Sequence, residues 1–195
     1  MAEVPLVPRA ALADAGRLPT FPGGGVTLAE RPLGRCFAVL ARRGQAEALA
    51  ETARGFGVTL PERPRRTAGR AHAVTWTGPT QWLVDTADDA EADGLLRLFA
   101  SHAALGRTVA LDDSRVVVSV GGARARDCLA KMLTIDLHPR SFAPGDAAVT
   151  VASGISVIVW LREDEPVFEC AVPRSMAPTF WEWLTESAVE YGLAS

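Results

Sequence analysis

The feature of this sequence that most constrains its fold is a predicted order of strand, helix and hairpin that occurs twice. The first part predicts a strand, a helix, a hairpin, a helix and a strand, at residues 35–41, 45–56, 71–86, 90–103 and 108–111. The second part predicts a strand, a helix, a hairpin, a strand and a terminal helix, at residues 116–120, 123–133, 147–161, 167–172 and 175–191. The first helices and the hairpins of the two parts are offset by roughly 76 to 78 residues. We therefore predict an α+β fold of two related, ferredoxin-like halves of the βαββ type.

Local patterns support individual elements in both parts. The apolar residues of the first helix follow the i, i+3, i+4, i+7 spacing of one helix face, at Ala46, Leu49, Ala50, Ala53 and Phe56. Both hairpins contain turn-forming residues between their strands, Gly78-Pro79 in the first and Ser153-Gly154 in the second.

Residues 1–33 differ from the rest of the chain in their content of proline and glycine. They hold five prolines and the run Gly23 to Gly25, with no sustained period of either 2 or 3.6. This pattern predicts an extended N-terminal arm over residues 1–33, which would become ordered against a partner. A single α+β domain then follows at 34–195, with its two halves at 34–111 and 112–195.

The size and charge of the chain exclude several classes of protein. Its 195 residues suit one core, which at this length can bury about 70% of the unfolded surface. The formal net charge of -3 excludes a strongly basic nucleic-acid-binding protein. Residues 1–16 lack the pattern of a secretory signal, and the longest apolar runs, such as 157–161, are far shorter than the 18 or so residues of a membrane span. We expect a cytoplasmic protein without a nucleic-acid or membrane partner.

The three cysteines, Cys36, Cys128 and Cys170, are odd in number and far apart, and each lies in an apolar segment. This pattern is typical of reduced thiols in the core of a cytosolic protein. It favours neither a disulfide framework nor a zinc site.

The segment from Gly121 to Arg126 is a candidate anion site. The order of strand, Gly121-Gly122 and helix is used by phosphate-binding loops, and Arg124 and Arg126 would assist an anion at the helix N-terminus. The segment lacks both the three spaced glycines of a dinucleotide fingerprint and the Gly-Lys-Ser/Thr of a P-loop. A tight turn between strand and helix is therefore the favoured interpretation.

A second candidate is Asp112-Asp113-Ser114, at the junction of the two halves. Paired carboxylates could hold a metal ion or act as acid and base. Asp and Ser are also common turn residues, and adjacent carboxylates on an extended chain point to opposite sides. A turn is again favoured.

The sequence contains no recognisable catalytic or metal-binding constellation. His72, His102 and His138 do not have the spacing of metal ligands, and no serine or cysteine lies in a nucleophile motif such as Gly-x-Ser-x-Gly. We predict no catalytic, cofactor-binding or metal-binding residue in this chain.

Four of the five tryptophans form the predicted partner interface: Trp76 and Trp82, which frame the first hairpin, and Trp181 and Trp183 in the terminal helix. On a helical wheel, the aromatic and apolar residues of that helix span an arc of about 160°, wider than the roughly 100° stripe of one core face. These rings would be core residues or would face another protein, where tryptophan is enriched. Both interpretations stay open for the terminal helix.

An ordered set of motifs resembles the gamma-subunit family of heterotetrameric sarcosine oxidase. The set begins with Trp76-x-Gly78-Pro79-x-Gln81-Trp82-Leu83 and Asp113-Ser114-Arg115, which leads into 116–121. It continues with Leu129-Ala130-Lys131, Asp136-Leu137, Phe142 and Gly145, and ends with Arg174-Ser175 and Phe180-Trp181-Glu182-Trp183-Leu184. The resemblance covers residues 34 to 192, most of the chain.

The resemblance implies a fold like the folate-binding region of glycine-cleavage aminomethyltransferases, in agreement with two α+β halves. It also implies alpha, beta and delta subunits as partners in a complex that oxidatively demethylates sarcosine to glycine. FAD, FMN, NAD, tetrahydrofolate and zinc would be held by those other subunits, and the gamma subunit would hold no cofactor. No catalytic residue of the family is carried over to this chain.

Two hypotheses follow for the function. The first is a non-catalytic structural subunit that docks on the flavoprotein subunits and stabilises their assembly. The alternative is a stand-alone, tetrahydrofolate-binding protein of the aminomethyltransferase type, with folate between its halves. At 195 residues the chain has little room for the additional domains that such proteins usually carry.

Overall fold

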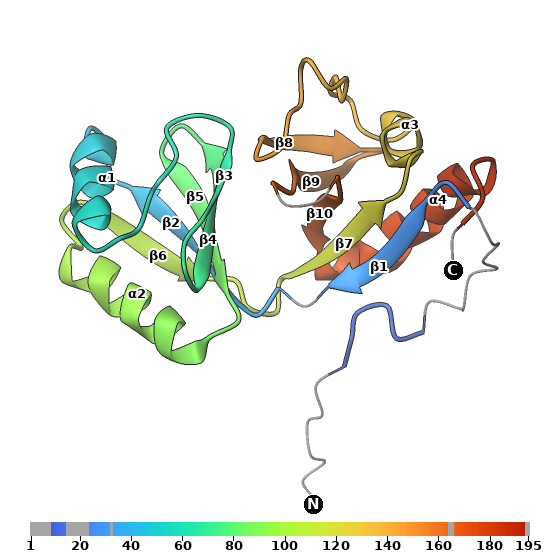
Figure 1. Ribbon diagram of the computed structural model, residues 1–195. Helices are drawn as coiled ribbons and strands as arrows, with labels where there is room; N and C mark the ends of the chain where they lie inside the picture. The colour runs from blue at the N-terminus through green and yellow to red at the C-terminus, as the bar shows by residue number, and fades with distance from the viewer. Residues whose placement is uncertain (1–8, 15–23, 32, 164–165, 194–195) are drawn as a thin grey trace, which may run out of the picture.

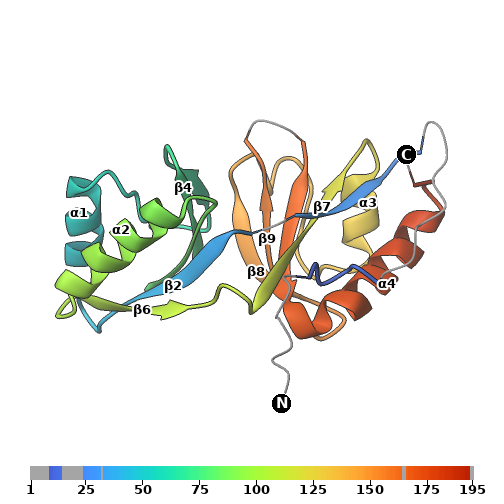
Figure 2. The same cartoon turned by 90° about the horizontal axis from the view of Figure 1, so that it is seen from below.

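Two five-stranded antiparallel sheets form the centre of the molecule. The computed structural model describes residues 9–14, 24–31, 33–163 and 166–193. The sheets lie face to face and the helices cover their outer faces, so the layers run helix, sheet, sheet, helix (Figures 1 and 2). The α+β prediction of two halves is confirmed.

The first sheet and its helices come from residues 35–110. The strand order is β3 (Arg66–Ala68), β4 (His72–Gly78), β5 (Gln81–Thr86), β2 (Arg35–Ala41) and β6 (Gly106–Ala110). Helices α1 (Ala46–Gly55) and α2 (Asp89–Ser101) pack on its outer face, where Phe37, Val39 and Trp82 belong to the buried core. Asp88 begins α2 because its carboxylate accepts hydrogen bonds from the amides of Ala90 and Glu91.

The second sheet combines the N-terminal strand with the later part of the chain. Its order is β1 (Thr27–Arg31), β7 (Arg115–Gly121), β10 (Phe168–Pro173), β9 (Ile155–Leu161) and β8 (Ala147–Ala152). Helix α3 (Ala125–Ala130), the 3-10 turn η1 (Arg174–Met176) and helix α4 (Ala177–Val189) complete this half. The alternating residues Val116, Val118 and Val120 of β7 point into the core beneath α3 and α4.

The inner faces of the two sheets share a third buried cluster. It joins Cys36 and Leu83 of the first sheet to Val117, Ile158 and Trp160 of the second. The two halves therefore pack through apolar side chains and are not separate bodies on a linker.

The predicted N-terminal arm needs a correction, because part of residues 1–33 belongs to the fold. Residues Thr27–Arg31 pair with β7 in register from Thr27 opposite Gly121 to Arg31 opposite Val117. Val26 is fully buried, and Leu12 is also buried in the same core. The sequence Val26-Thr27-Leu28-Ala29-Glu30 has the period of a strand, but it is too short to stand out between glycines and prolines. Residues 1–8, 15–23 and 32 of the predicted arm lie outside the described residues.

The topology also changes which elements of the halves are equivalent. The first half runs β2-α1-β3-β4-β5-α2-β6, and the second runs β7-α3-β8-β9-β10-α4, with β1 in the sheet position of β6. The hairpin at residue 154 therefore corresponds to β3 and β4, and not to the hairpin at residue 78 as the spacing predicted. In the first half, the strand that follows the second helix is β6, which lies beside β2. In the second half, β1 lies in the corresponding position beside β7.

Candidate functional site

The four predicted interface tryptophans do not form one surface. Trp82 is 3% exposed, and its indole nitrogen donates to the carbonyl of Pro61 at 2.8 Å. Its assignment to a partner interface is wrong, because the hydrogen bond and the surrounding core satisfy both ends of the ring. Trp76 is half-buried and packs against the same core.

Trp181 and Trp183 on α4 are half-buried and pack against the second core. Phe180 and Leu184, on the same helix, are fully buried. The wide aromatic arc therefore contains a buried centre with a tryptophan on each side. The indole Nε1 of Trp181 is enclosed and has no hydrogen-bond partner among the described residues. The exposed parts of these two rings remain a predicted partner contact.

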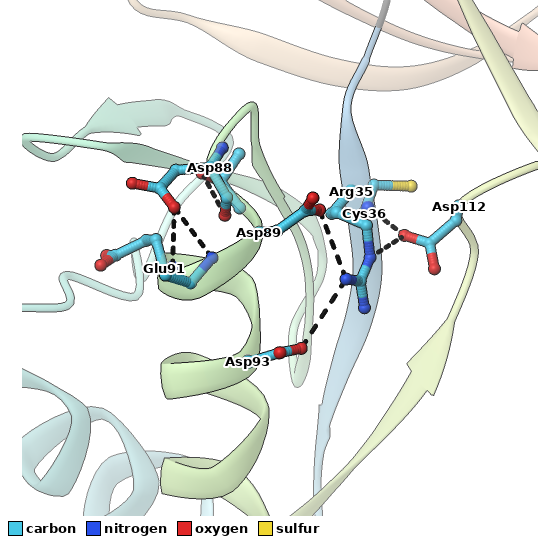
Figure 3. Close-up of polar contacts among 9 residues, drawn as sticks. Arg35, Cys36, Asp88, Asp89, Glu91, Asp93 and Asp112 are labelled. Carbon is cyan, nitrogen blue, oxygen red and sulfur yellow. Dashed lines mark hydrogen bonds and ion pairs between the residues drawn. The ribbon is translucent and has the colours of Figure 1, made fainter.

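The acidic segment at the junction of the halves is a structural turn. Figure 3 shows Asp112 accepting from the backbone amide of Cys36 at 2.7 Å and from Nε of Arg35 at 3.3 Å. Arg35 also lies 3.5 Å from Asp89 and 3.7 Å from Asp93 on α2, and Asp112 is the main cause of its raised pKa. The amide of Ser114 donates to the carbonyl of Leu111 at 2.9 Å, which confirms the predicted turn. The contacts of Asp112 and Arg35 hold β2, α2 and the crossing between the halves together.

The Gly121-Gly122 segment is likewise a turn. Gly122 has φ +95°, and a Cβ there would lie 2.4 Å from the carbonyl oxygen of Gly25. Arg124 is paired with Asp127 at 2.9 Å, and Arg126 donates to the carbonyl oxygens of Leu137 and Phe142. The predicted turn is confirmed, and both arginines contact groups of this chain.

The histidines are dispersed in the fold. His72 pairs with Glu91 at 2.6 Å, His102 contacts the carbonyl of Leu98 at 2.9 Å, and His138 accepts from an amide in its own turn. Within the part of the chain that the structure describes, no three metal-binding side chains gather. The described helices also include none that is long and apolar enough to cross a membrane.

The three cysteines are free and buried, and burial raises the pKa of each thiol. The pKa reaches about 12 for Cys36 and about 11 for Cys128. A raised pKa keeps a thiol protonated and unreactive, since the thiolate is the nucleophile. We expect the native chain to react with a disulfide reagent at pH 8 at roughly a hundredth of the rate of the unfolded chain. Rapid labelling of any one thiol in the native chain would contradict this expectation.

The strongest polar cluster lies in a groove between the sheets, of about 410 Å³. Arg66 forms two hydrogen bonds with Asp85, at 2.6 and 2.8 Å, and its guanidinium lies 4.4 Å from the centre of the Trp160 ring. The Trp160 indole donates to Glu169 at 2.7 Å, and Arg31 pairs with the other oxygen of that carboxylate. The cluster thus links β3 and β5 of one sheet to β9 and β10 of the other.

The contacts in this cluster indicate a structural role and not a catalytic one. Glu169 is only 3% exposed, and each of its carboxylate oxygens already has a partner. Asp85 is also buried and fully paired with Arg66. Sequence reasoning missed both carboxylates; the signal available was a single acidic residue inside each otherwise apolar strand, which indicates a buried partner.

Comparisons with known proteins agree with the resemblance drawn from the motifs. Residues 43–190 match the model of the family described as "Sarcosine oxidase, gamma subunit family". The sarcosine oxidase subunit gamma of an Arthrobacter species is 29% identical over 145 residues, which cover 73% of this chain and 70% of that protein. The sarcosine oxidase subunit gamma of Corynebacterium sp. (strain U-96) is 29% identical over 148 residues, which cover 74% of this chain and 71% of that protein.

Solved structures show similar folds. A chain of the heterotetrameric sarcosine oxidase from Corynebacterium sp. U-96, in complex with pyrrole 2-carboxylate, has a TM-score of 0.81 and 27% identity, with 96% of this chain and 98% of that chain covered. The glycine cleavage system aminomethyltransferase T from Bartonella henselae has a TM-score of 0.58 at 16% identity, with 83% of this chain and 45% of that chain covered. The second likeness concerns the fold alone, and it confirms the fold expected from the motifs.

Proposed function

Because this chain belongs to the sarcosine oxidase gamma subunit family, we propose that it is the non-catalytic assembly subunit of a heterotetrameric sarcosine oxidase. The observation that carries the proposal is the likeness to a chain of that heterotetramer over 96% of this chain and 98% of the other. Nearly the whole chain thus has the fold of one component of such a complex, which supports a place for it in a similar assembly.

The polar network supports a structural role. The buried carboxylates Asp85 and Glu169 bind arginines and an indole of the same chain, which leaves neither as a base for a substrate. The cysteines are protonated and enclosed. These two carboxylates are therefore engaged in holding the fold together, and the three thiols are not activated as nucleophiles.

We place the partners and cofactors in the rest of the complex. The alpha, beta and delta subunits would bind FAD, FMN, NAD, tetrahydrofolate and zinc and would demethylate sarcosine to glycine in the cytoplasm. The donor sets of the described residues do not fit zinc, because no three potential ligands converge. The contribution of this chain would be to hold the other subunits in place.

The rival function is tetrahydrofolate binding by the isolated chain, which the shared aminomethyltransferase fold raises. Trp160 and Arg66 line the groove between the sheets, where the Arg66 guanidinium lies over the Trp160 ring and both side chains already bind carboxylates of this chain. Titration of the isolated chain with a reduced folate distinguishes the two functions. Saturable micromolar binding would favour the rival.

Expression of a tagged copy in its native cell tests the assembly role. We expect the tagged chain to co-purify with flavoprotein subunits in equal amounts, as a yellow complex that oxidises sarcosine. Deletion of the gene should lower the yield of assembled complex and leave the flavins bound to whatever complex forms. A colourless tagged monomer would contradict the proposal.

A further inference from the structure

The space between the two sheets holds a second cleft besides the groove that contains the polar cluster. In the groove, Arg66 and Trp160 belong to the buried network described above. The second cleft, of about 230 Å³, lies between the inner faces of the sheets and has a different set of lining residues. Ala38 and Gln81 line it from the first sheet, and Val149 and Ser156 line it from the second.

Apolar side chains are exposed on both sides of this cleft. Val149 and Val151 of β8 are each 45% exposed, and Val151 pairs with Ser156, which lines the cleft. On the opposite sheet, Val109 of β6 is 44% exposed and pairs with the cleft residue Ala38. Both β8 and β6 are edge strands, so these valines form an apolar rim on two sheet edges.

Arg115 adds an unpaired positive charge to the same cleft. Its side chain lines the cleft from β7, next to Leu111 and Ile158. Its Nη1 atom is enclosed, with no hydrogen-bond acceptor among the described residues, and burial lowers the pKa of the guanidinium. Arg115 as a whole is half-buried. An arginine stays charged near neutral pH, and a partly desolvated cation without a counter-charge is unfavourable. A carboxylate is the group that would pair best with it.

We propose that this cleft is a docking site for an apolar segment of another subunit of the complex, whose acidic side chain or terminal carboxylate pairs with Arg115. The proposal rests on the assembly role given above and adds the surface and the chemistry of the contact. The apolar part of the segment would cover Val109, Val149 and Val151. Its carboxylate would neutralise the guanidinium of Arg115, for which the described residues supply no carboxylate partner.

A polypeptide segment fits these features better than the other occupants. A small carboxylic acid would pair with Arg115 but would leave the valine rims on the two edge strands exposed. A second copy of this chain would bring another Arg115 to a symmetric contact, and the described residues that line the cleft include no carboxylate to pair with it. A different, acidic and apolar partner satisfies both requirements.

Substitutions in the full-length chain, co-expressed with the other subunits, test the site. We expect Arg115→Met to weaken assembly by at least about tenfold, since a desolvated charge pair is lost, and Arg115→Lys to weaken it less. We expect Val149→Asp to weaken assembly similarly, because the new carboxylate pairs with Arg115 within the chain and meets the apolar segment. Phe56→Asp is the matched control, since Phe56 is 63% exposed outside the cleft.

The unfolding temperature of each isolated variant separates loss of docking from loss of fold. Arg115→Met should unfold at or above the temperature of the unsubstituted chain, because a half-buried charge with an enclosed, unpartnered nitrogen is removed. If the unsubstituted chain assembles and Arg115→Met and Val149→Asp assemble equally well, the docking site is overturned while the assembly role stands. If the unsubstituted chain fails to assemble, both proposals fall.

A photoreactive amino acid at position 151 identifies the occupant in the assembled complex. The expected result is a covalent adduct with another subunit, at a segment that contains an acidic residue. An adduct with a second copy of this chain would overturn the proposal. The proposal would also be overturned if no subunit formed an adduct and the isolated chain bound acetate in a manner that depends on Arg115.

Discussion

Removal of residues 1–31 is expected to unfold the second half of the molecule. Val26 would be lost from the core, and burial of such a side chain is worth about 1.5–3 kcal/mol. The strand β1 would be lost from its pairing with β7, where each backbone hydrogen bond contributes roughly 0.5–1.5 kcal/mol. The sum approaches the total stability of about 5–15 kcal/mol that a domain of this kind has. Near-ultraviolet circular dichroism should show loss of fixed tryptophan environments, and calorimetry should show a smaller unfolding enthalpy.

A chain that lacks residues 1–24 but retains β1 is the matched control, and it should keep both sheets. It loses Leu12 and the hydrogen bonds from the amides of Ala11 and Leu12 to Glu30, so a smaller decrease in stability, of about 2.5–6 kcal/mol, is expected. Equal unfolding curves for the chains lacking 1–24 and 1–31 would show that β1 contributes nothing to the second half.

A circular permutant tests why β1 matters. The amide of Gly25 donates to the carbonyl of Tyr191 at 2.9 Å, and that of Val26 donates to Gly192 at 3.1 Å, so β1 begins beside the end of α4. A chain that starts at residue 34 and joins Leu193 to Gly25 through a short glycine linker would place β1 after α4. We expect it to unfold within about 1–2 kcal/mol of the chain lacking residues 1–24, because neighbouring termini tolerate permutation. An unfolded permutant would contradict the equivalence of β1 and β6.

Sequence patterns predicted the elements whose apolar residues are adjacent or regularly spaced along the chain. The strand at 35–41 matches β2, the hairpin at 147–161 matches β8 and β9, and the helix near 45–56 matches α1. The apolar residues of α1 recur at helical spacing because one face of the helix is buried. Strands β2 and β9 are nearly continuous apolar runs because both of their faces are buried, one against the helices and the other against the opposite sheet.

Elements that are stabilised mainly by residues far away in the sequence were not predicted. Strand β3 has three residues, Arg66–Ala68, and its arginine faces inward because it forms an ion pair with Asp85. Strand β1 depends on β7, which lies in the second half of the chain. The equivalence of the halves was misassigned for the same reason, since without β3 the two hairpins looked equivalent.

The candidate site shows the same limit. Sequence reasoning identified Asp112 and Gly122 as turn residues because turn chemistry is local. It could not separate Trp82 from Trp181, because the acceptor for the Trp82 indole is a carbonyl that only the fold brings near. Nor could it find the unpaired guanidinium of Arg115, since the lack of a partner is a property of the folded surroundings.

The substitution Asp85→Ala is expected to destabilise the chain by about 3–5 kcal/mol. It removes the carboxylate that accepts two hydrogen bonds from Arg66, and it leaves that guanidinium between the sheets with the Thr75 hydroxyl as an acceptor but without the carboxylate that balances its charge. Breaking a buried ion pair from one side has this large cost because the remaining charge stays desolvated. Urea unfolding of the full chain measures the effect, and Asp89→Ala is the control, since Asp89 is 83% exposed and its pairing with Arg35 is worth less than about 1 kcal/mol.

The double substitution Arg66→Met with Asp85→Leu tests whether that cost comes from the unpaired charge. Two apolar side chains of similar volume remove both desolvation penalties, so the double variant should recover most of the stability lost in Asp85→Ala. The new methionine side chain would still cover the face of Trp160, where the Arg66 guanidinium now lies 4.4 Å from the ring centre. If the double variant is as unstable as Asp85→Ala, the cohesion between the sheets depends on the ion pair itself. The cluster would then have to be regarded as a net source of stability and not as a charge pair that packing tolerates.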